Sequence, residues 1–194
     1  MNSAITGVIL AGGKSLRMGT DKALLKLDGR PFVAHVASTL QSVFNRVLLV
    51  ANDASAYRSI GLETYGDVFL DCGPLGGIHS GLVHAGGSGV FICACDTPFI
   101  TANLVRYIAE FPSSSAVKIP SLNQQLYPLC GLYTQRCLQP VTEQLEAGRY
   151  RVLDFVDSIE AAVIPIAPDL PFYRKNLLTN FNTREEYSGN KNNL

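Results

Sequence analysis

Apolar runs of strand length alternate along this chain with segments that carry apolar residues at helical spacing. The runs 5–10, 46–51 and 89–95 are almost wholly apolar, as strands buried on both faces of a parallel sheet are. Between them, Pro31 can open a helix, and residues 32–43 place an apolar stripe at helical spacing. Strands that alternate with helices build βαβ units. The sequence therefore predicts an α/β fold: a single Rossmann-like three-layer domain with a mostly parallel twisted sheet flanked by helices.

The other expected elements follow from the same patterns. We expect further helices at 54–60, 77–85, 101–110, 135–147 and 152–158, and further strands at 62–65, 116–120, 126–133 and 162–166. Thr101 is expected to cap the helix that follows it. Residues 67–77, rich in Gly, Pro and Asp, are expected to form a loop. The whole length of 194 residues fits one domain.

The composition excludes several partners and sites. Sixteen basic and sixteen acidic side chains cancel, so no overall charge attracts nucleic acid or an anionic membrane, and any phosphate site must be local. No apolar run reaches the roughly 20 residues that span a bilayer. We expect a cytoplasmic location, no nucleic-acid partner and no membrane partner. The five cysteines form no C-x-x-C pair and are expected to be small buried hydrophobic residues.

The first apolar run leads directly into a loop of glycines and cations. Gly12 and Gly13 follow the run, and Lys14, Arg17 and Lys22 come within nine residues of one another. Glycines allow close backbone approach, and free N–H groups at such a turn form a concavity that binds anions. This combination suits the triphosphate of a nucleotide.

The two common phosphate-binding motifs do not fit the spacing of this loop. A Walker loop would require Gly at the position of Val8. The dinucleotide pattern G-x-G-x-x-G does not match Gly12, Gly13 and Gly19. The loop therefore indicates a mononucleotide site, with a plain glycine turn and solvated charges as the alternative.

Two aspartates follow predicted strands where open α/β sheets bind ligands. Asp96 comes directly after the run 89–95, and one carboxylate together with phosphate oxygens is what Mg²⁺ prefers. Asp96 is thus a candidate to hold Mg²⁺ against the triphosphate; the alternative is a turn residue before Pro98. Asp67 follows the strand at 62–65 and is a candidate to accept hydrogen bonds from a base or ribose.

The second half of the chain offers weaker candidates. Arg149 and Arg151 flank Tyr150 and form a basic spot for a phosphorylated second substrate, or else exposed loop charge. Asn182 either caps a short helix or supplies an amide near the metal.

Taken in order, these motifs resemble the molybdenum cofactor guanylyltransferases over nearly the whole chain. The motifs are Leu10-Ala11-Gly12-Gly13-Lys14-Ser15, Arg17-Met18-Gly19, Asp21-Lys22, Asp67, Gly73-Pro74-Leu75, Cys95-Asp96-Thr97-Pro98, Leu129-Cys130-Gly131-Leu132-Tyr133, Gly148 with Arg149 and Arg151, and Asn180-Phe181-Asn182-Thr183. The first motif marks the wider nucleotidyltransferase group, and the ordered set is specific to the family.

The resemblance implies an activity and a division of the chain. That family transfers GMP from GTP to the terminal phosphate of Mo-molybdopterin, with Mg²⁺, and releases pyrophosphate. It implies one nucleotidyltransferase domain over 1–187, with a GTP-binding half at 1–100, a molybdopterin-side half at 101–187, and a flexible tail at 188–194. Other molybdenum cofactor biosynthesis proteins and apo-molybdoenzymes would be its further partners.

The resemblance also implies the roles of single residues. The nucleotide-binding set is Leu10, Ala11, Gly12, Gly13, Lys14, Lys22, Asp67 and Asp96, with Asp96 also the metal ligand. Arg17, Lys22 and Asp96 would be catalytic, and Arg149, Arg151 and Asn182 would face molybdopterin. The family often has an Asn at the end of the second strand, where this chain has Val50, with Asn52 two residues later.

The implied reaction is an in-line attack of the molybdopterin phosphate on the α-phosphorus of GTP, without a covalent enzyme intermediate. Two alternatives stay open. One is a cytidylyltransferase of the same fold that acts on molybdopterin or on a sugar or alditol phosphate, although the order Ala11-Gly12-Gly13 resembles the guanine-using branch. The other is a non-catalytic GTP-binding carrier of the cofactor.

Overall fold

The computed structural model describes residues 5–11 and 22–180. One long sheet forms its centre, with the strand order β10-β7-β9-β6-β1-β4-β5 and β8 paired to β7. The strands are β1 (Ile5–Leu10), β4 (Val47–Val50), β5 (Glu63–Tyr65), β6 (Gly89–Ala94), β7 (Val117–Leu122), β8 (Gln125–Leu126), β9 (Cys130–Thr134) and β10 (Ala162–Pro165). The helices are η2 (Lys22–Leu24), α1 (Phe32–Gln41), η3 (Ala54–Ile60), α2 (Gly73–Ala85), α3 (Ala102–Glu110), η4 (Gln135–Cys137), α4 (Leu138–Glu146) and α5 (Val152–Ser158), where η marks a 3₁₀ helix.

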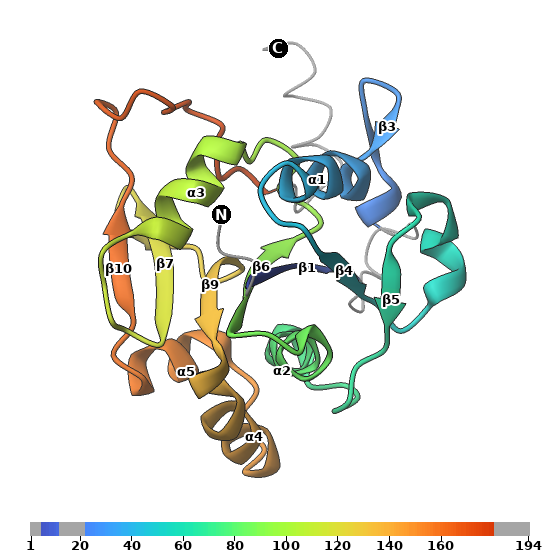
Figure 1. The fold of residues 1–194 in the computed structure, drawn as a ribbon, viewed down its shortest axis with the longest axis vertical. Helices are drawn as coiled ribbons and strands as arrows, with labels where there is room; N and C mark the ends of the chain where they lie inside the picture. Colours follow the sequence, from blue (N-terminus) through green and yellow to red (C-terminus); the bar gives the residue numbers. More distant parts are fainter. Residues whose placement is uncertain (1–4, 12–21, 181–194) are drawn as a thin grey trace.

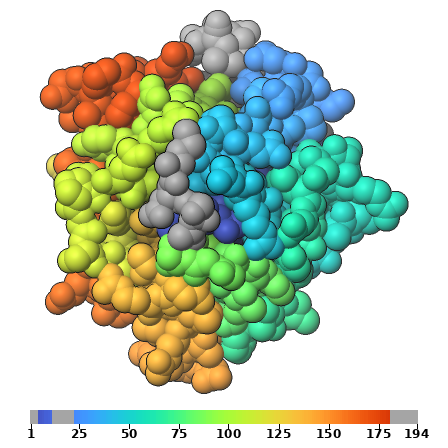
Figure 2. Space-filling model, in the orientation of Figure 1, coloured from blue at the N-terminus to red at the C-terminus, as the bar shows by residue number. Residues whose placement is uncertain are grey.

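Helices cover both faces of the sheet, so the molecule has three layers. Helices α1 and α3 lie on one face, and α2, α4 and α5 lie on the other (Figure 1). Alternate residues of β1 divide between the two cores: Ile9 packs on the α1 face and Val8 on the α2 face, both fully buried. In the space-filling view the first half of the chain, blue to green, lies beside the second half, yellow to red (Figure 2). The expected fold class is confirmed.

The strand β1 is central and its neighbours run in the same direction. It pairs in parallel with β4 on one side and with β6 on the other. The strand β9 is reversed, because it pairs antiparallel with both β6 and β7. The carboxyl ends of β1, β4, β5 and β6 therefore meet at one edge of the sheet, and β9 begins there.

Several predicted bounds differ from the structure. Helix α2 begins at Gly73 rather than at residue 77, because Pro74 occupies the first turn, where its missing N–H is no loss. The expected strand at 126–133 is divided into β8 and β9, and Pro128, which has no N–H for a ladder, lies between them. The segment 54–60 is a 3₁₀ helix rather than an α-helix.

A small hairpin was not expected from the sequence. Its strands are β2 (Lys26–Leu27) and β3 (Arg30–Pro31), which pair antiparallel. Asp28 and Gly29 join them with positive φ angles of 49° and 79°. An Asp-Gly pair is the usual signal for such a turn, so the sequence does contain the information.

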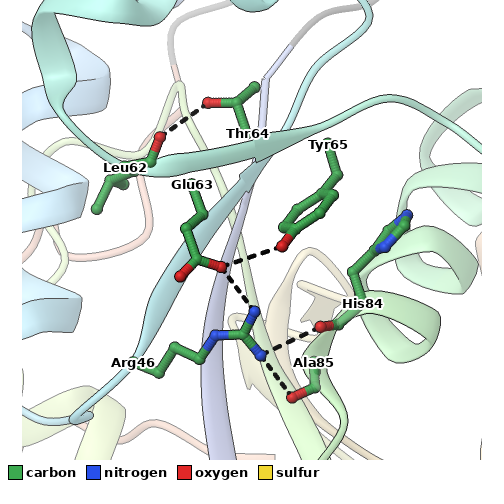
Figure 3. Close-up of polar contacts among 7 residues, drawn as sticks. All are labelled: Arg46, Leu62, Glu63, Thr64, Tyr65, His84 and Ala85. Atoms are coloured by element: carbon green, nitrogen blue, oxygen red, sulfur yellow. Dashed lines mark hydrogen bonds and ion pairs between the residues drawn. The ribbon is translucent and has the colours of Figure 1, made fainter.

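Helix α2 is anchored at its carboxyl end by an arginine from the strand side (Figure 3). Arg46 Nη1 donates to the carbonyls of His84 and Ala85, at 3.1 and 2.8 Å, and Arg46 Nη2 donates to Glu63 Oε2 at 2.7 Å. The hydroxyl of Tyr65 also donates to Glu63 Oε2, and its ring stacks on His84 with centroids 4.2 Å apart. Since helix carbonyls at this end carry partial negative charge, the cation holds α2 against β4 and β5.

None of the helices in the described part of the chain is both long enough and apolar enough to cross a membrane.

Candidate active site

The carboxyl edge of the sheet is ordered by backbone hydrogen bonds that continue beyond the strands. Ala11 N donates to Val50 O at 2.9 Å, and Ala51 N donates to Tyr65 O at 2.8 Å. Cys95 N donates to Leu10 O at 3.0 Å. The first residue after each of β1, β4 and β6 is therefore held in line, and the segments that follow leave the sheet side by side.

Asp67 lies at this edge, two residues beyond β5, in a reciprocal pair with Asn52 from the segment after β4. Asn52 Nδ2 donates to Asp67 Oδ2 at 2.9 Å, and Asp67 N donates to Asn52 Oδ1 at 2.8 Å. The pair thus joins two neighbouring strand ends through both the backbone and the side chain of Asp67.

The second carboxylate oxygen of Asp67 has no such partner. Oδ1 is buried, and no group in the described part of the chain donates a hydrogen bond to it. Burial raises the pKa of this carboxyl, and the hydrogen bond from Asn52 lowers it by less. A buried acceptor without a donor costs free energy, so this oxygen is suited to accept a hydrogen bond from a ligand.

The residue after Asp67 is fixed by helix α2. Val68 N donates to Ser80 Oγ at 2.8 Å, and the same hydroxyl donates to Gly76 O at 3.0 Å. Ser80 is fully buried. The backbone is therefore held on both sides of the Asp67 side chain, by Asn52 and by Ser80.

Helix α2 lies close against the central strands because glycines face them. A Cβ on Gly77 would lie 3.1 Å from Leu10 Cδ2, and a Cβ on Gly81 would lie 3.0 Å from Val8 Cγ1. A Cβ on Gly76 would lie 3.0 Å from Phe69 O. The glycines noted in the sequence thus bring the amino end of α2 close to the end of β1.

Asp96 lies at the same edge, two residues beyond β6, and is partly buried. Its segment is tied to the sheet by Thr97, whose Oγ1 donates to Ala94 O at 2.8 Å and lies 3.4 Å from Cys93 Sγ. Cys93 is fully buried, and burial raises its thiol pKa well above the usual range. This cysteine is a packing residue, as expected from the sequence; indeed all five cysteines are buried and unbridged.

Asp67 and Asp96 flank the ends of β1 and β4. The strands that deliver them, β5 and β6, are three places apart in the sheet, which corresponds to about 14 Å between strand axes. The two carboxylates therefore bracket the point where the chain leaves β1 and enters the glycine loop. An elongated ligand that donates hydrogen bonds at one end and brings a cation-bound anionic group at the other would fit this arrangement.

The donor set suits a metal ion that is completed by its substrate. The described residues contain no cluster of three or more His, Cys, Asp or Glu side chains that would hold a metal by themselves. Mg²⁺ is commonly bound by one or two carboxylates together with phosphate oxygens and water. Asp96 fits that pattern.

Two backbone groups of the predicted nucleotide-binding residues already form hydrogen bonds within the sheet. The carbonyl of Leu10 and the N–H of Ala11 both take part in the bonds described above. Gly12, Gly13, Lys14 and Arg17 lie outside the described residues, as does Asn182. Lys22 is the first residue of η2. The nucleotide roles assigned to these residues remain predictions.

Arg149 and Arg151 lie between α4 and α5, and both are exposed. Gly148 turns the chain there with a φ of 73°, and Arg149 N donates to Gln144 O at 3.0 Å. Arg151 Nη1 forms an ion pair with Asp154 Oδ1 at 3.2 Å. Their role on the second-substrate side remains a prediction.

Asn52 is the residue at this edge whose role the sequence did not reveal. The sequence drew attention to it only because the family often has an Asn at the end of the second strand, where this chain has Val50. In the structure it lies two residues beyond β4, as Asp67 does beyond β5 and Asp96 beyond β6. In the sequence, its place directly after the predicted strand at 46–51 is the signal that could have found it.

Residues 7–162 match the family model described as "MobA-like NTP transferase domain". A "Probable molybdenum cofactor guanylyltransferase" of Pelotomaculum thermopropionicum is 38% identical over 150 residues, which cover 77% of this chain and 73% of the relative. A "Molybdenum cofactor guanylyltransferase" of Desulfosudis oleivorans is 35% identical over 191 residues, covering 94% of this chain and 92% of the relative.

Solved structures share the fold. A crystal structure of a protein from Aquifex aeolicus matches with a TM-score of 0.79 and 28% identity, covering 92% of this chain and 94% of that one. Molybdopterin-guanine dinucleotide biosynthesis protein A from Archaeoglobus fulgidus also matches with a TM-score of 0.79, at 20% identity and 95% coverage of both chains.

Proposed function

The chain belongs to the family of MobA-like NTP transferase domains, and from this premise we propose that it is a molybdenum cofactor guanylyltransferase. It transfers GMP from GTP to the terminal phosphate of Mo-molybdopterin and releases pyrophosphate. Relatives that carry this activity in their names match it at 35–38% identity, which supports the assignment.

The observation that carries the proposal is the pair of carboxylates at one edge of the sheet. Asp67 offers an acceptor to the nucleoside part of GTP, and Asp96 faces the phosphate part. Between them the chain enters the glycine loop, whose amides are expected to contact the phosphates. A nucleoside triphosphate has the matching polarity, with hydrogen-bond donors at one end and charge at the other.

Each residue has a proposed task in the reaction. Asp96 holds Mg²⁺, which when bound would neutralise charge on the phosphate oxygens. Lys14, Arg17 and Lys22 bind the β- and γ-phosphates and stabilise the negative charge that develops on the departing pyrophosphate. Orientation of the α-phosphorus for in-line attack then supplies much of the rate. All five cysteines are buried, which gives no support to a covalent route through a cysteine nucleophile.

The second substrate approaches from the carboxyl-terminal half. Arg149, Arg151 and Asn182 bind the molybdopterin phosphate by charge and hydrogen bonding, and the product passes to apo-molybdoenzymes or to other proteins of cofactor biosynthesis. Arg151 would exchange its surface ion pair with Asp154 for the substrate phosphate, which is feasible because exposed ion pairs are weak.

The test is a product assay with the purified chain, Mg²⁺, molybdopterin and, in separate reactions, GTP, CTP or ATP. We expect pyrophosphate and a dinucleotide product in the reaction with GTP, and neither product in the reactions with CTP or ATP. Turnover with CTP in place of GTP would identify a cytidylyltransferase instead. Binding of GTP without any pyrophosphate release would identify a carrier and contradict the proposed activity.

A further inference from the structure

Asn52 is an exposed side chain, yet both polar atoms of its amide are bonded to Asp67. Exposed amides ordinarily remain mobile and bind water, because ordering a side chain costs conformational entropy. The two hydrogen bonds close a ring, because the Asn52 amide binds both the backbone N–H and the carboxylate of Asp67. Such a ring fixes the plane of the carboxylate as well as its position.

The ring makes the two carboxylate oxygens of Asp67 unequal. Oδ2 accepts from Asn52 Nδ2 at 2.9 Å, whereas Oδ1 is buried and accepts no hydrogen bond from the residues that the structure describes. On the following residue, Ser80 holds the backbone N–H of Val68 at 2.8 Å. The Asp67 carboxylate is therefore held in place from two elements, the segment after β4 and helix α2.

We propose that Asn52 is a positioning residue of the nucleotide site, which holds Asp67 so that Oδ1 accepts one hydrogen bond from the nucleoside part of GTP. This inference rests on the proposed function. Asn52 itself acts through Asp67 and touches no reacting atom. An ionised carboxylate forms a stronger hydrogen bond than a neutral acceptor, so its orientation affects affinity directly.

The arrangement predicts a pH signature that loss of folding would not produce. Burial raises the pKa of Asp67, and the bond from Asn52 opposes this rise by stabilising the ionised form. Removing the amide therefore moves the pKa of Asp67 further upward. Since nucleotide binding needs the ionised carboxylate, GTP affinity would then begin to fall at a higher pH as the solution is acidified.

The experiment is calorimetric titration of the full chain with GTP and Mg²⁺ across a pH series. The variants are Asn52→Ala, Asn52→Asp, Asp67→Ala and the double variant, with Asn45→Ala as the matched control. Asn45 is likewise an exposed asparagine next to β4, but at the strand's opposite end. Melting temperatures of all variants report whether folding is intact.

We expect Asn52→Ala to weaken GTP binding roughly tenfold and to shift the acidic limb upward. Asn52→Asp should weaken it further, because two facing carboxylates repel. In the Asp67→Ala background, Asn52→Ala should cause no further loss, since a residue that acts through another is not additive with it. Asn45→Ala should bind GTP as the wild type does.

Nucleotide analogues identify the donor that Asp67 receives. If the base donates, inosine triphosphate, which lacks the guanine amino group, should bind more weakly to the wild type, and Asn52→Ala should reduce that difference. If the ribose donates, a deoxynucleotide should behave in this way instead. Either result supports the proposal.

Three results would overturn it. Equal GTP affinity and an unchanged pH profile in folded Asn52→Ala would remove the role of Asn52 and leave the proposed function standing. Additive losses in the double variant would show that Asn52 acts independently of Asp67. If the wild type binds no GTP, the proposed function fails, and this inference fails with it.

Discussion

At the scale of single residues, Asp67 is placed well for binding and poorly for stability. Its carboxyl pKa is raised by burial in the folded chain. A group of this kind stabilises the fold below its unfolded pKa, and that contribution is lost as the pH rises through the folded pKa. At neutral pH the folded protein therefore retains a charge that the unfolded chain would hydrate better.

We accordingly expect Asp67→Asn to raise the melting temperature at pH 7 while it weakens GTP binding. The amide keeps the size of the side chain and an acceptor for Asn52, but it carries no charge. Thermal unfolding at several pH values checks this, and the stability gap should narrow as the pH falls toward the range where an unfolded Asp protonates. A lower melting temperature at pH 7 would mean that groups other than Asn52 stabilise the carboxylate.

Asp96 belongs to the same scale and supports a different prediction. Asp96→Ala should lower kcat at least about 100-fold, because it removes the proposed anchor for the metal and phosphates. Pyrophosphate release with GTP and molybdopterin measures the effect. The melting temperatures of the variant and the wild type report whether the variant is folded. Wild-type turnover in this variant at ordinary Mg²⁺ would contradict the assignment.

At the scale of elements, the Arg46 side chain joins the carboxyl end of α2 to β4 and β5 (Figure 3). We expect Arg46→Ala to lower the free energy of unfolding by about 1–2 kcal/mol. This is modest for three hydrogen bonds, because the arginine side chain is 38% exposed and screened by solvent. Denaturant unfolding measures it.

Glu63→Gln is the matched control for the arginine variant. It removes the ion pair but leaves both bonds from Arg46 to the helix carbonyls, so its effect should be clearly smaller. Arg46 lowers the pKa of Glu63, so the contribution of the pair is present above the unfolded pKa of Glu63 and lost as the pH falls through the folded value. If Glu63→Gln were as damaging as Arg46→Ala, the helix carbonyls would not be the main partners.

Elements were predictable where periodicity and end signals agree. The helix at 152–158 and the strand at 5–10 have the predicted bounds, and Thr101 caps α3 by accepting from Leu104 N at 3.3 Å. The predicted bounds were wrong near two prolines: α2 begins earlier than expected, next to Pro74, and the expected strand at 126–133 is divided at Pro128. Local patterns also cannot state strand direction, so the reversal of β9 depends on tertiary pairing.

The site was predictable only in part, for a related reason. Asp67 and Asp96 follow apolar strands, and the rule that ligands bind beyond strand ends was sufficient to select them. Asn52 follows a strand in the same way, but its importance arises from a side-chain pair between two strand ends. The order of the strands in the sheet decides which side chains meet at its edge, and sequence patterns do not predict that order.

At the scale of the whole molecule, ligand binding and folding stability are linked. In the proposed function, GTP with Mg²⁺ would bind the folded chain at an edge built from four separate strands, which the unfolded chain cannot form. At a GTP concentration about 100 times the Kd, the folded state should gain about 2.7 kcal/mol, or roughly 5–10 °C in melting temperature. CTP at the same concentration should give a smaller shift, and an equal shift would contradict guanine selectivity.

Because β1 lies in the middle of the sheet, the sheet can form fully only late in synthesis. Ile5 pairs with Gly89, so the earliest strand must wait for a segment made much later. Until β6 emerges from the ribosome, one side of β1 offers unpaired amides and carbonyls to any passing strand, as an open sheet edge does. The nascent protein should therefore be most prone to aggregation, and most dependent on chaperones, in the interval between these two strands.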